Sequence, residues 1–299
     1  RQRSLALGGN SRREHFPTKE TCIDYVNDID GPETCNTYNM LKLTEDLNRV
    51  NHQGMYGDFY ETAIFNHILS AQHPEHGGYV YFTSARPRHY RNYSAPNKAM
   101  WCCVGTGMED HGKYGQFIWT HDKGMKTEDD ALYVNLFVAS ELNWKERKMV
   151  LRQQTAFPYA ETSNIEVTKG KGVFTLKIRK PLWCDNFTVK GVGFVVDCYE
   201  ENGFVCIKRK WKKGDQVEIS MPMHASIKPM INVPQYVAIM YGPILLGMKS
   251  GTEDMRSLIA DDSRFGQYAA GMKLPLDKAP ILLPKHLNDI AKDLKPIPD

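Results

Sequence analysis

The spacing of apolar residues changes once along this chain, near residue 130, and this change limits the folds open to it. Before it, apolar residues recur every three or four positions, as in Met40, Leu43 and Leu47, which is the period of an amphipathic helix. After it, apolar and polar residues alternate, as in "GVFTLKIRK" at 172–180, which is typical of half-buried strands. A helical part is therefore expected to precede a β part.

The length of 299 residues favours two domains. Residues 1–125 are expected to be helical, and residues 126–249 to form an antiparallel β-sandwich of short strands between Gly- and Asn-rich turns. Residues 250–299 hold several prolines and few β-branched residues, which predicts an irregular tail packed on the body. Three helices cannot easily enclose a large core, so the helical part is predicted to be the remnant of a bigger helical domain.

Local signals place the ends of the helices. The first helix is predicted to start after Gly31-Pro32, the second near Asp58 as its N-cap, and the third near Thr106. The apolar run 236–247 suits a final core strand.

Composition argues against two classes of partner. No stretch of 18 apolar residues is present, so no membrane span is expected. The net charge is only +3, and the densest basic run, 208–213, ends in a Gly-Asp turn. This run is interpreted as a solvated strand end, so no nucleic-acid binding is predicted.

Seven cysteines cannot form a complete set of disulfides within one chain. Two of them, Cys102 and Cys103, are adjacent and are followed at once by Gly-Thr-Gly. A strained redox pair, a structural metal site and a nucleophile are the three alternatives for this pair.

Glu33 and Cys35 lie two residues apart at an expected chain bend. With Cys102 and Cys103 they would supply one carboxylate and three thiolates, a set that suits tetrahedral zinc. Residue types alone favour a different interpretation, in which the three cysteines are small buried hydrophobic residues. A closed, purely structural zinc site is the other alternative.

A zinc-bound thiol is ionised and so is available as a nucleophile. Glu14, after a Gly-Gly turn, is a candidate acid that would protonate a leaving group; the alternative is an exposed loop glutamate beside two arginines. Glu61 could accept hydrogen bonds from a polyhydroxylated ligand, the alternative being a solvated helix position.

Aromatic residues crowd the segment between the second and third helices. Sugars present apolar faces rimmed by hydroxyls, so such residues suit a sugar pocket, although a helical core also uses them. They are Tyr79, Tyr81, Phe82, Tyr90, Tyr93 and Trp101.

Four motifs together carry a resemblance to a known family: "GGNSRREHF", "ETCNTYNMLKLTEDL", "YETAIFNHIL" and "MWCCVGTGMEDHGKYGQFIW". They resemble the zinc-dependent β-L-arabinofuranosidases of glycoside hydrolase families 127 and 146, most closely the branch of gut Bacteroides-type bacteria. "WKKGDQVEISMPM" and "YGPILLG" are similar to the C-terminal half of that group. The resemblance covers nearly the whole chain.

This resemblance implies a retaining glycosidase with a cysteine nucleophile. Glu33, Cys35, Cys102 and Cys103 would hold the zinc, and Cys102 would attack the anomeric carbon. Glu14 would act first as the general acid and then as the base.

The resemblance also implies that Glu61 and Tyr81 contact the sugar.

The family's catalytic domain is an (α/α)6 barrel that begins several hundred residues before the sandwich, so this chain would supply only its last helices and, as a piece, could be inactive. A plant glycan that contains arabinose is the implied substrate, and the bacterial periplasm or exterior the implied location. The sequence leaves the oligomeric state open.

The rival hypothesis is a non-catalytic module that binds glycans or a partner through a β-sandwich and holds a structural zinc ion. A catalytic centre needs Glu14 near Cys102 in an open cleft. A closed structural site would leave Glu14 pointing to solvent.

Overall fold

The computed structural model describes residues 4–16, 22–283, 290 and 294. The chain divides into two compact units, each built from separate segments. Unit 1 comprises Arg1–Leu43, Thr62–His111 and His224–Asp299, and unit 2 comprises Thr44–Glu61 and Gly112–Met223. The division falls within helices α2 (Thr34–Val50) and α3 (Gly54–Ala63) and near the end of α4 (Cys102–Lys113).

The helices lie close to where the apolar period predicts them. The first predicted helix is α2, which begins at Thr34, shortly after Gly31-Pro32. The second, α3, begins at Gly54, so the expected N-cap Asp58 lies inside the helix instead. The third, α4, begins at Cys102, four residues before the predicted start, because the cysteine pair itself forms its first turn. The shorter helical elements are α1 (Asp24–Asn27), a π-helical turn η1 (Ile64–Ile68) and six 3-10 turns: η2 (Leu69–Ala71), η3 (Tyr114–Gln116), η4 (Thr127–Asp129), η5 (Lys145–Arg147), η6 (Arg264–Gln267) and η7 (Leu276–Lys278).

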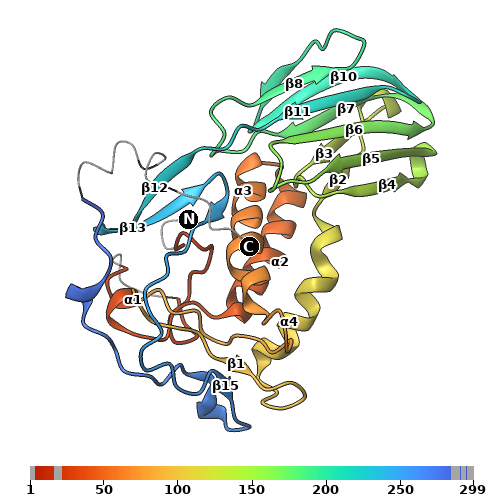
Figure 1. Ribbon diagram of the computed structural model, residues 1–299. Coiled ribbons are helices and arrows are strands. Elements are labelled where there is room, and N and C mark those ends of the chain that lie inside the picture. Colours follow the sequence, from red (N-terminus) through yellow and green to blue (C-terminus); the bar gives the residue numbers. More distant parts are fainter. Residues whose placement is uncertain (1–3, 17–21, 284–289, 291–293, 295–299) are drawn as a thin grey trace. The chain divides into compact units, whose positions relative to one another are not determined.

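Unit 2 contains two five-stranded sheets (Figure 1). The first has the order β2 (Trp119–Asp122), β3 (Ala131–Val134), β7 (Lys171–Arg179), β10 (Phe204–Lys212), β9 (Tyr199–Glu201). The second has the order β4 (Ser140–Trp144), β5 (Met149–Thr155), β6 (Thr162–Lys169), β11 (Gln216–Ser220), β8 (Thr188–Gly191). All pairs are antiparallel except β3 with β7.

Side chains from the two sheets meet in one core. Trp144 of β4 packs edge-on against Phe174 of β7, with ring centroids 5.4 Å apart. Val217 and Ile219, two positions apart on β11, are fully buried, while Glu218 between them is exposed. This is the alternation that the sequence predicts for half-buried strands.

A buried ion-pair group joins α3 to β7 within unit 2. The Arg179 guanidinium is fully buried and donates to Glu61 Oε1 at 2.5 Å and to Asp58 Oδ1 at 2.8 Å. Arg179 Nε also donates to the carbonyl oxygen of Asn135 at 2.6 Å. These partners compensate the cost of removing a guanidinium from water.

Unit 1 holds a separate three-stranded sheet of β12 (Ala225–Met230), β13 (Val233–Tyr241) and β14 (Ile244–Leu245). The apolar run 236–247 therefore spans two strands and the turn at Gly242 rather than one strand, and it does not join the two larger sheets. Further along, β15 (Ile259–Ala260) pairs in parallel with β1 (Tyr93–Ser94). Arg86 and Arg88 donate to the carbonyl oxygens of Leu274 and Lys278, so the tail is held to other segments of unit 1 as far as residue 278.

The protein is thus a mixed α and β structure in which α1 to α4 precede the strands of the two five-stranded sheets along the chain. Within the part of the chain that the structure describes, no helix has the length and apolar character needed to cross a membrane.

We expect Arg179→Ala to lower the free energy of unfolding by about 3–5 kcal/mol, because it leaves two carboxylates buried without their cation. Denaturant unfolding followed by circular dichroism measures this. The matched control is Arg152→Ala, which removes an exposed pair with Glu141 at 3.0 Å and should cost less than about 1 kcal/mol. Equal losses in the two variants would contradict this account of Arg179.

Candidate metal centre

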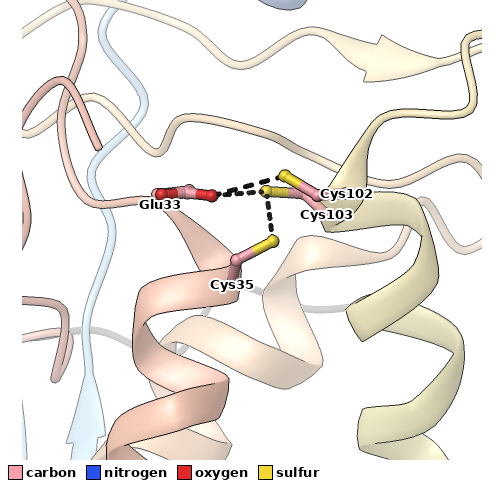
Figure 2. Close-up of side chains that lie close together, drawn as sticks. All are labelled: Glu33, Cys35, Cys102 and Cys103. Atoms are coloured by element: carbon pink, nitrogen blue, oxygen red, sulfur yellow. Dashed lines mark hydrogen bonds between the residues drawn. The ribbon is translucent and has the colours of Figure 1, made fainter.

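The N-terminal end of α2, with the residue before it, and the first turn of α4 bring four side chains together: Glu33, Cys35, Cys102 and Cys103 (Figure 2). Their ligand atoms all lie within 4.8 Å of one another, and only Cys102 is exposed. Cys35 Sγ and Cys103 Sγ are 3.1 Å apart. Glu33 Oε1 lies 3.4 Å from Cys103 Sγ and 3.6 Å from Cys102 Sγ.

Local structure explains why these side chains converge. Glu33 precedes α2 and forms a β-bridge with Phe82, while its backbone N–H donates to Ser11 Oγ at 3.0 Å. Its backbone is therefore not yet helical, and Glu33 and Cys35 can face the same side, as the chain bend predicts. Cys102 and Cys103 open α4. The N-termini of helices favour negative charge, which suits thiolate and carboxylate groups.

Burial and crowding alter the acidity of these groups. Burial raises the pKa of Glu33 to about 6, and it raises the pKa of the Cys103 thiol. The hydrogen bond from Cys103 lowers the pKa of Cys102 to about 5, and the Tyr81 hydroxyl acts in the same direction. Of the two adjacent cysteines, Cys102 is thus the exposed one and the one that ionises more readily.

The donor set fits a metal ion. Three sulfur atoms and one carboxylate oxygen match the ligands and the number that zinc takes in proteins. No lysine or arginine of the described residues is hydrogen-bonded to these four side chains, so a bound cation would supply the charge that a buried carboxylate and thiolates need.

Glu14 lies close to the cluster through Tyr81. The Tyr81 hydroxyl donates to Glu14 Oε1 and lies 3.6 Å from Cys102 Sγ. Glu14 is exposed, yet one hydroxyl connects its carboxylate to the thiol. A closed structural site was expected to leave Glu14 pointing to solvent; here Glu14 is exposed and its carboxylate also contacts Tyr81.

The turn that carries Glu14 is conformationally demanding. Arg12 and His15 exchange two backbone hydrogen bonds, and Arg13 and Glu14 between them have φ of +50° and +65°. Residues other than glycine rarely adopt positive φ values. Ion pairs of 2.5 Å from Arg12 to Asp28 and from Arg13 to Asp30 hold the turn.

Glu61 belongs to unit 2, where it is only 2% exposed. The alternative of a solvated helix position is therefore wrong. Arg179 Nη2 donates to one of its oxygens at 2.5 Å, and Trp183 Nε1 donates to the other at 2.8 Å. Its contact with a sugar stays a prediction.

Two residues that contact the cluster, Thr106 and Ser11, could not be recognised from the sequence. The Thr106 hydroxyl lies 3.3 Å from Cys35 Sγ, and Ser11 accepts from the Glu33 amide. Both lie in stretches that hold candidate residues, "CCVGTG" and "GGNSRRE", but neither residue type signals a contact with a ligand sulfur or carboxylate. The aromatic residues Tyr81, Phe82, Trp101 and Tyr268 pack around Cys35 and Cys103, and the last of them comes from the C-terminal tail.

Comparison with models of protein families shows to which family the chain belongs. Residues 1–116 match the family model "Beta-L-arabinofuranosidase, GH127 catalytic domain", and residues 131–223 match the "GH127 middle domain". The chain belongs to the GH127 β-L-arabinofuranosidase family. Residues 226–299 match a third model, a domain of unknown function. No curated protein sequence gives a significant match.

Solved structures of this family share the fold. A GH127 β-arabinofuranosidase is 23% identical with a TM-score of 0.67, and the match covers 81% of this chain and 41% of that one. A GH127 β-L-arabinofuranosidase from Geobacillus stearothermophilus T6 is also 23% identical, with a TM-score of 0.67, and the match covers 81% of this chain and 40% of that one. The GH127 chain thus spans about two fifths of the length of these structures.

Protein purified without added metal should contain about one zinc ion per chain. The double variant Cys35→Ala, Cys103→Ala should lose it, because two of four ligands are removed. Elemental analysis measures the content, and Cys198→Ala, which removes an exposed cysteine, is the control. Absence of zinc, or its retention in the double variant, would exclude this site.

The affinity for zinc should fall as the pH decreases, because the thiols that are protonated in the free protein lose their protons on binding. Below pH 6 Glu33, with a pKa of about 6, also takes up a proton. The affinity should then fall by about a further factor of ten for each pH unit. Competition with a chromophoric chelator between pH 5 and 8 measures this, and an unchanged slope across pH 6 would contradict the role of Glu33.

Proposed function

We propose that this chain carries the nucleophile and the acid/base of a retaining β-L-arabinofuranosidase. The observation that supports this most directly is the Tyr81 hydroxyl, which connects the Glu14 carboxylate to the exposed Cys102 thiol. A nucleophile and an acid/base close to one another are what a retaining glycosidase needs. Family membership supports the class of reaction, and the removal of β-linked L-arabinofuranose from a plant glycan is the proposed activity.

Glu33, Cys35, Cys102 and Cys103 are the proposed zinc ligands. When bound, zinc would keep the cysteines ionised and would fix the direction of Cys102. Cys103 and Cys35 are buried, which suits plain ligands, whereas Cys102 is exposed and can approach a substrate.

In the first step, Cys102 Sγ forms a bond to the anomeric carbon while the glycosidic carbon–oxygen bond breaks. Glu14 gives its proton to the departing oxygen, so that the aglycone leaves as an alcohol. The product is a thioglycoside between Cys102 and arabinose.

In the second step, water attacks the same carbon, Glu14 takes the proton of that water, and Cys102 leaves as a thiolate. Two inversions give net retention. The single Tyr81 proton can serve Glu14 or Cys102 but not both at once. Tyr81 would therefore donate to Glu14 when this residue is ionised, and to Cys102 when Glu14 carries a proton.

The domain architecture and the residues that contact the sugar are part of the same proposal. The helices of residues 1–125 are proposed to be the last helices of an (α/α)6 barrel, and residues 250–299 a tail packed on the body. A β-sandwich domain was expected over residues 126–249; it is now proposed to end at Met223, because the strands that follow form a separate sheet of unit 1. Tyr81 is proposed to contact the sugar, and the same role for Glu61 stays a prediction from the resemblance, since its buried carboxylate accepts from Arg179 and Trp183. By resemblance, the enzyme acts in the bacterial periplasm or outside the cell.

We expect Cys102→Ser in the whole natural polypeptide to lower the hydrolysis of an aryl β-L-arabinofuranoside by at least about 1,000-fold. Serine keeps the shape but is not ionised. Release of the aryl alcohol measures the rate, and Cys198→Ser should leave it unchanged. Unchanged turnover in Cys102→Ser would exclude this nucleophile, and a wild-type protein that holds zinc without hydrolysis would favour the non-catalytic module.

Glu14→Gln should lower hydrolysis by about 10²–10⁴-fold for glycosides with poor leaving groups, since these need the proton most. With an activated aryl leaving group, the formation of the thioglycoside should be affected less. Rates for a series of aryl aglycones measure the difference. An equal loss over the whole series would argue against Glu14 as the acid.

A further inference from the structure

Residues of the region that matches a domain of unknown function form hydrogen bonds with the segment next to the metal centre. β15 pairs with β1, and Asn92 Nδ2 donates to the carbonyl oxygens of Gly266 and, at 3.2 Å, of Tyr268. The Tyr90 hydroxyl donates to the carbonyl oxygen of Arg256 and accepts from the amide of Gly271, both at 2.7 Å. All of these residues belong to unit 1, which also holds the cluster.

These contacts bring the Tyr268 side chain to the centre. Its ring stacks on Phe82, with centroids 5.2 Å apart and planes at 28°. It packs against the buried group of Cys35, Tyr81, Phe82 and Cys103. A side chain from the C-terminal region thus touches the residues that surround the proposed ligands.

These contacts leave part of the Tyr268 side chain accessible. It is half-buried, so part of its surface is open. No described residue forms a hydrogen bond with its hydroxyl, which interacts electrostatically with the Arg13 guanidinium. Asn92 donates to its backbone carbonyl. A tyrosine that is fixed at the backbone and ring, and whose hydroxyl has no hydrogen bond to a described residue, presents an apolar surface and a polar tip, which is the combination that suits a sugar.

We propose that Tyr268 contacts the glycan bound at this centre, so that the C-terminal region of unknown function completes the wall of the sugar-binding site. The inference rests on the proposed function for the identity of the ligand, an arabinose-containing glycan. It assigns Tyr268 to recognition: the ring covers an apolar sugar face and the hydroxyl bonds to a sugar hydroxyl.

The test compares Tyr268→Ala and Tyr268→Phe in the whole natural polypeptide. Binding of L-arabinose is measured by calorimetry, and metal content is measured in the same samples. Tyr268→Ala should weaken binding by about tenfold or more, because it removes both the ring and the hydroxyl. Tyr268→Phe keeps the stacking on Phe82 and should weaken binding by about fivefold. Tyr159→Ala, which removes a tyrosine that is 97% exposed in unit 2, is the matched control and should bind as the wild type does.

Weaker binding with unchanged metal content supports the proposal. Wild-type affinity in both Tyr268 variants would overturn it, as would a wild-type protein that does not bind L-arabinose. If Tyr268→Ala does not fold, Tyr268→Phe decides, because the ring stays in place. Hydrolysis of the aryl arabinofuranoside by the wild type is a separate measurement. Binding that depends on Tyr268 without any hydrolysis would refute the proposed activity and leave the role of Tyr268 standing.

Discussion

The contact between the first turns of α2 and α4 is the interaction on which the rest of the site depends. It places Cys35 Sγ 3.1 Å from Cys103 Sγ and leaves the neighbouring Cys102 exposed. Adjacent residues at the start of a helix point in different directions, which explains how two consecutive cysteines reach different environments. Cys103 is buried among aromatic residues, while Cys102 faces Tyr81 and the exposed turn of Glu14.

Electrostatics adds a second constraint. Glu33 is buried and its pKa is raised by burial, so its ionised form is costly unless a cation is near. The exposed turn of Glu14 is held instead by arginine–aspartate pairs that stand apart from the four clustered side chains. The carboxylate in the cluster and the carboxylate proposed for proton transfer thus sit in environments that differ in charge and in access to water, which suits groups with different tasks.

The sequence predicts some parts of this arrangement well and others not at all. The change of period places α2 and the strands of unit 2, because burial of one face dictates both patterns. The types of the residues suggested Cys35, Cys102 and Cys103 as ligands of one ion, but their spacing is a weak signal, because nearly 70 residues separate them and their meeting depends on the tertiary fold. Asp58 was misplaced because its charge suggested a helix cap, whereas its partner Arg179 lies 121 residues further on, beyond the reach of any local pattern. Tyr268 was missed for the same reason, as it meets Phe82 only through the fold of the tail.

The four clustered side chains come from two places in the chain, and Cys35 and Cys103 are 68 residues apart. An ion bound to them would act as a cross-link that closes this loop. For a disulfide, closing a loop of this size removes chain entropy worth about 4 kcal/mol. The loop includes Tyr81, so the residue that faces both Glu14 and Cys102 lies inside the segment that such a cross-link would restrain. Loss of the ion would then loosen the whole loop as well as release the ligands.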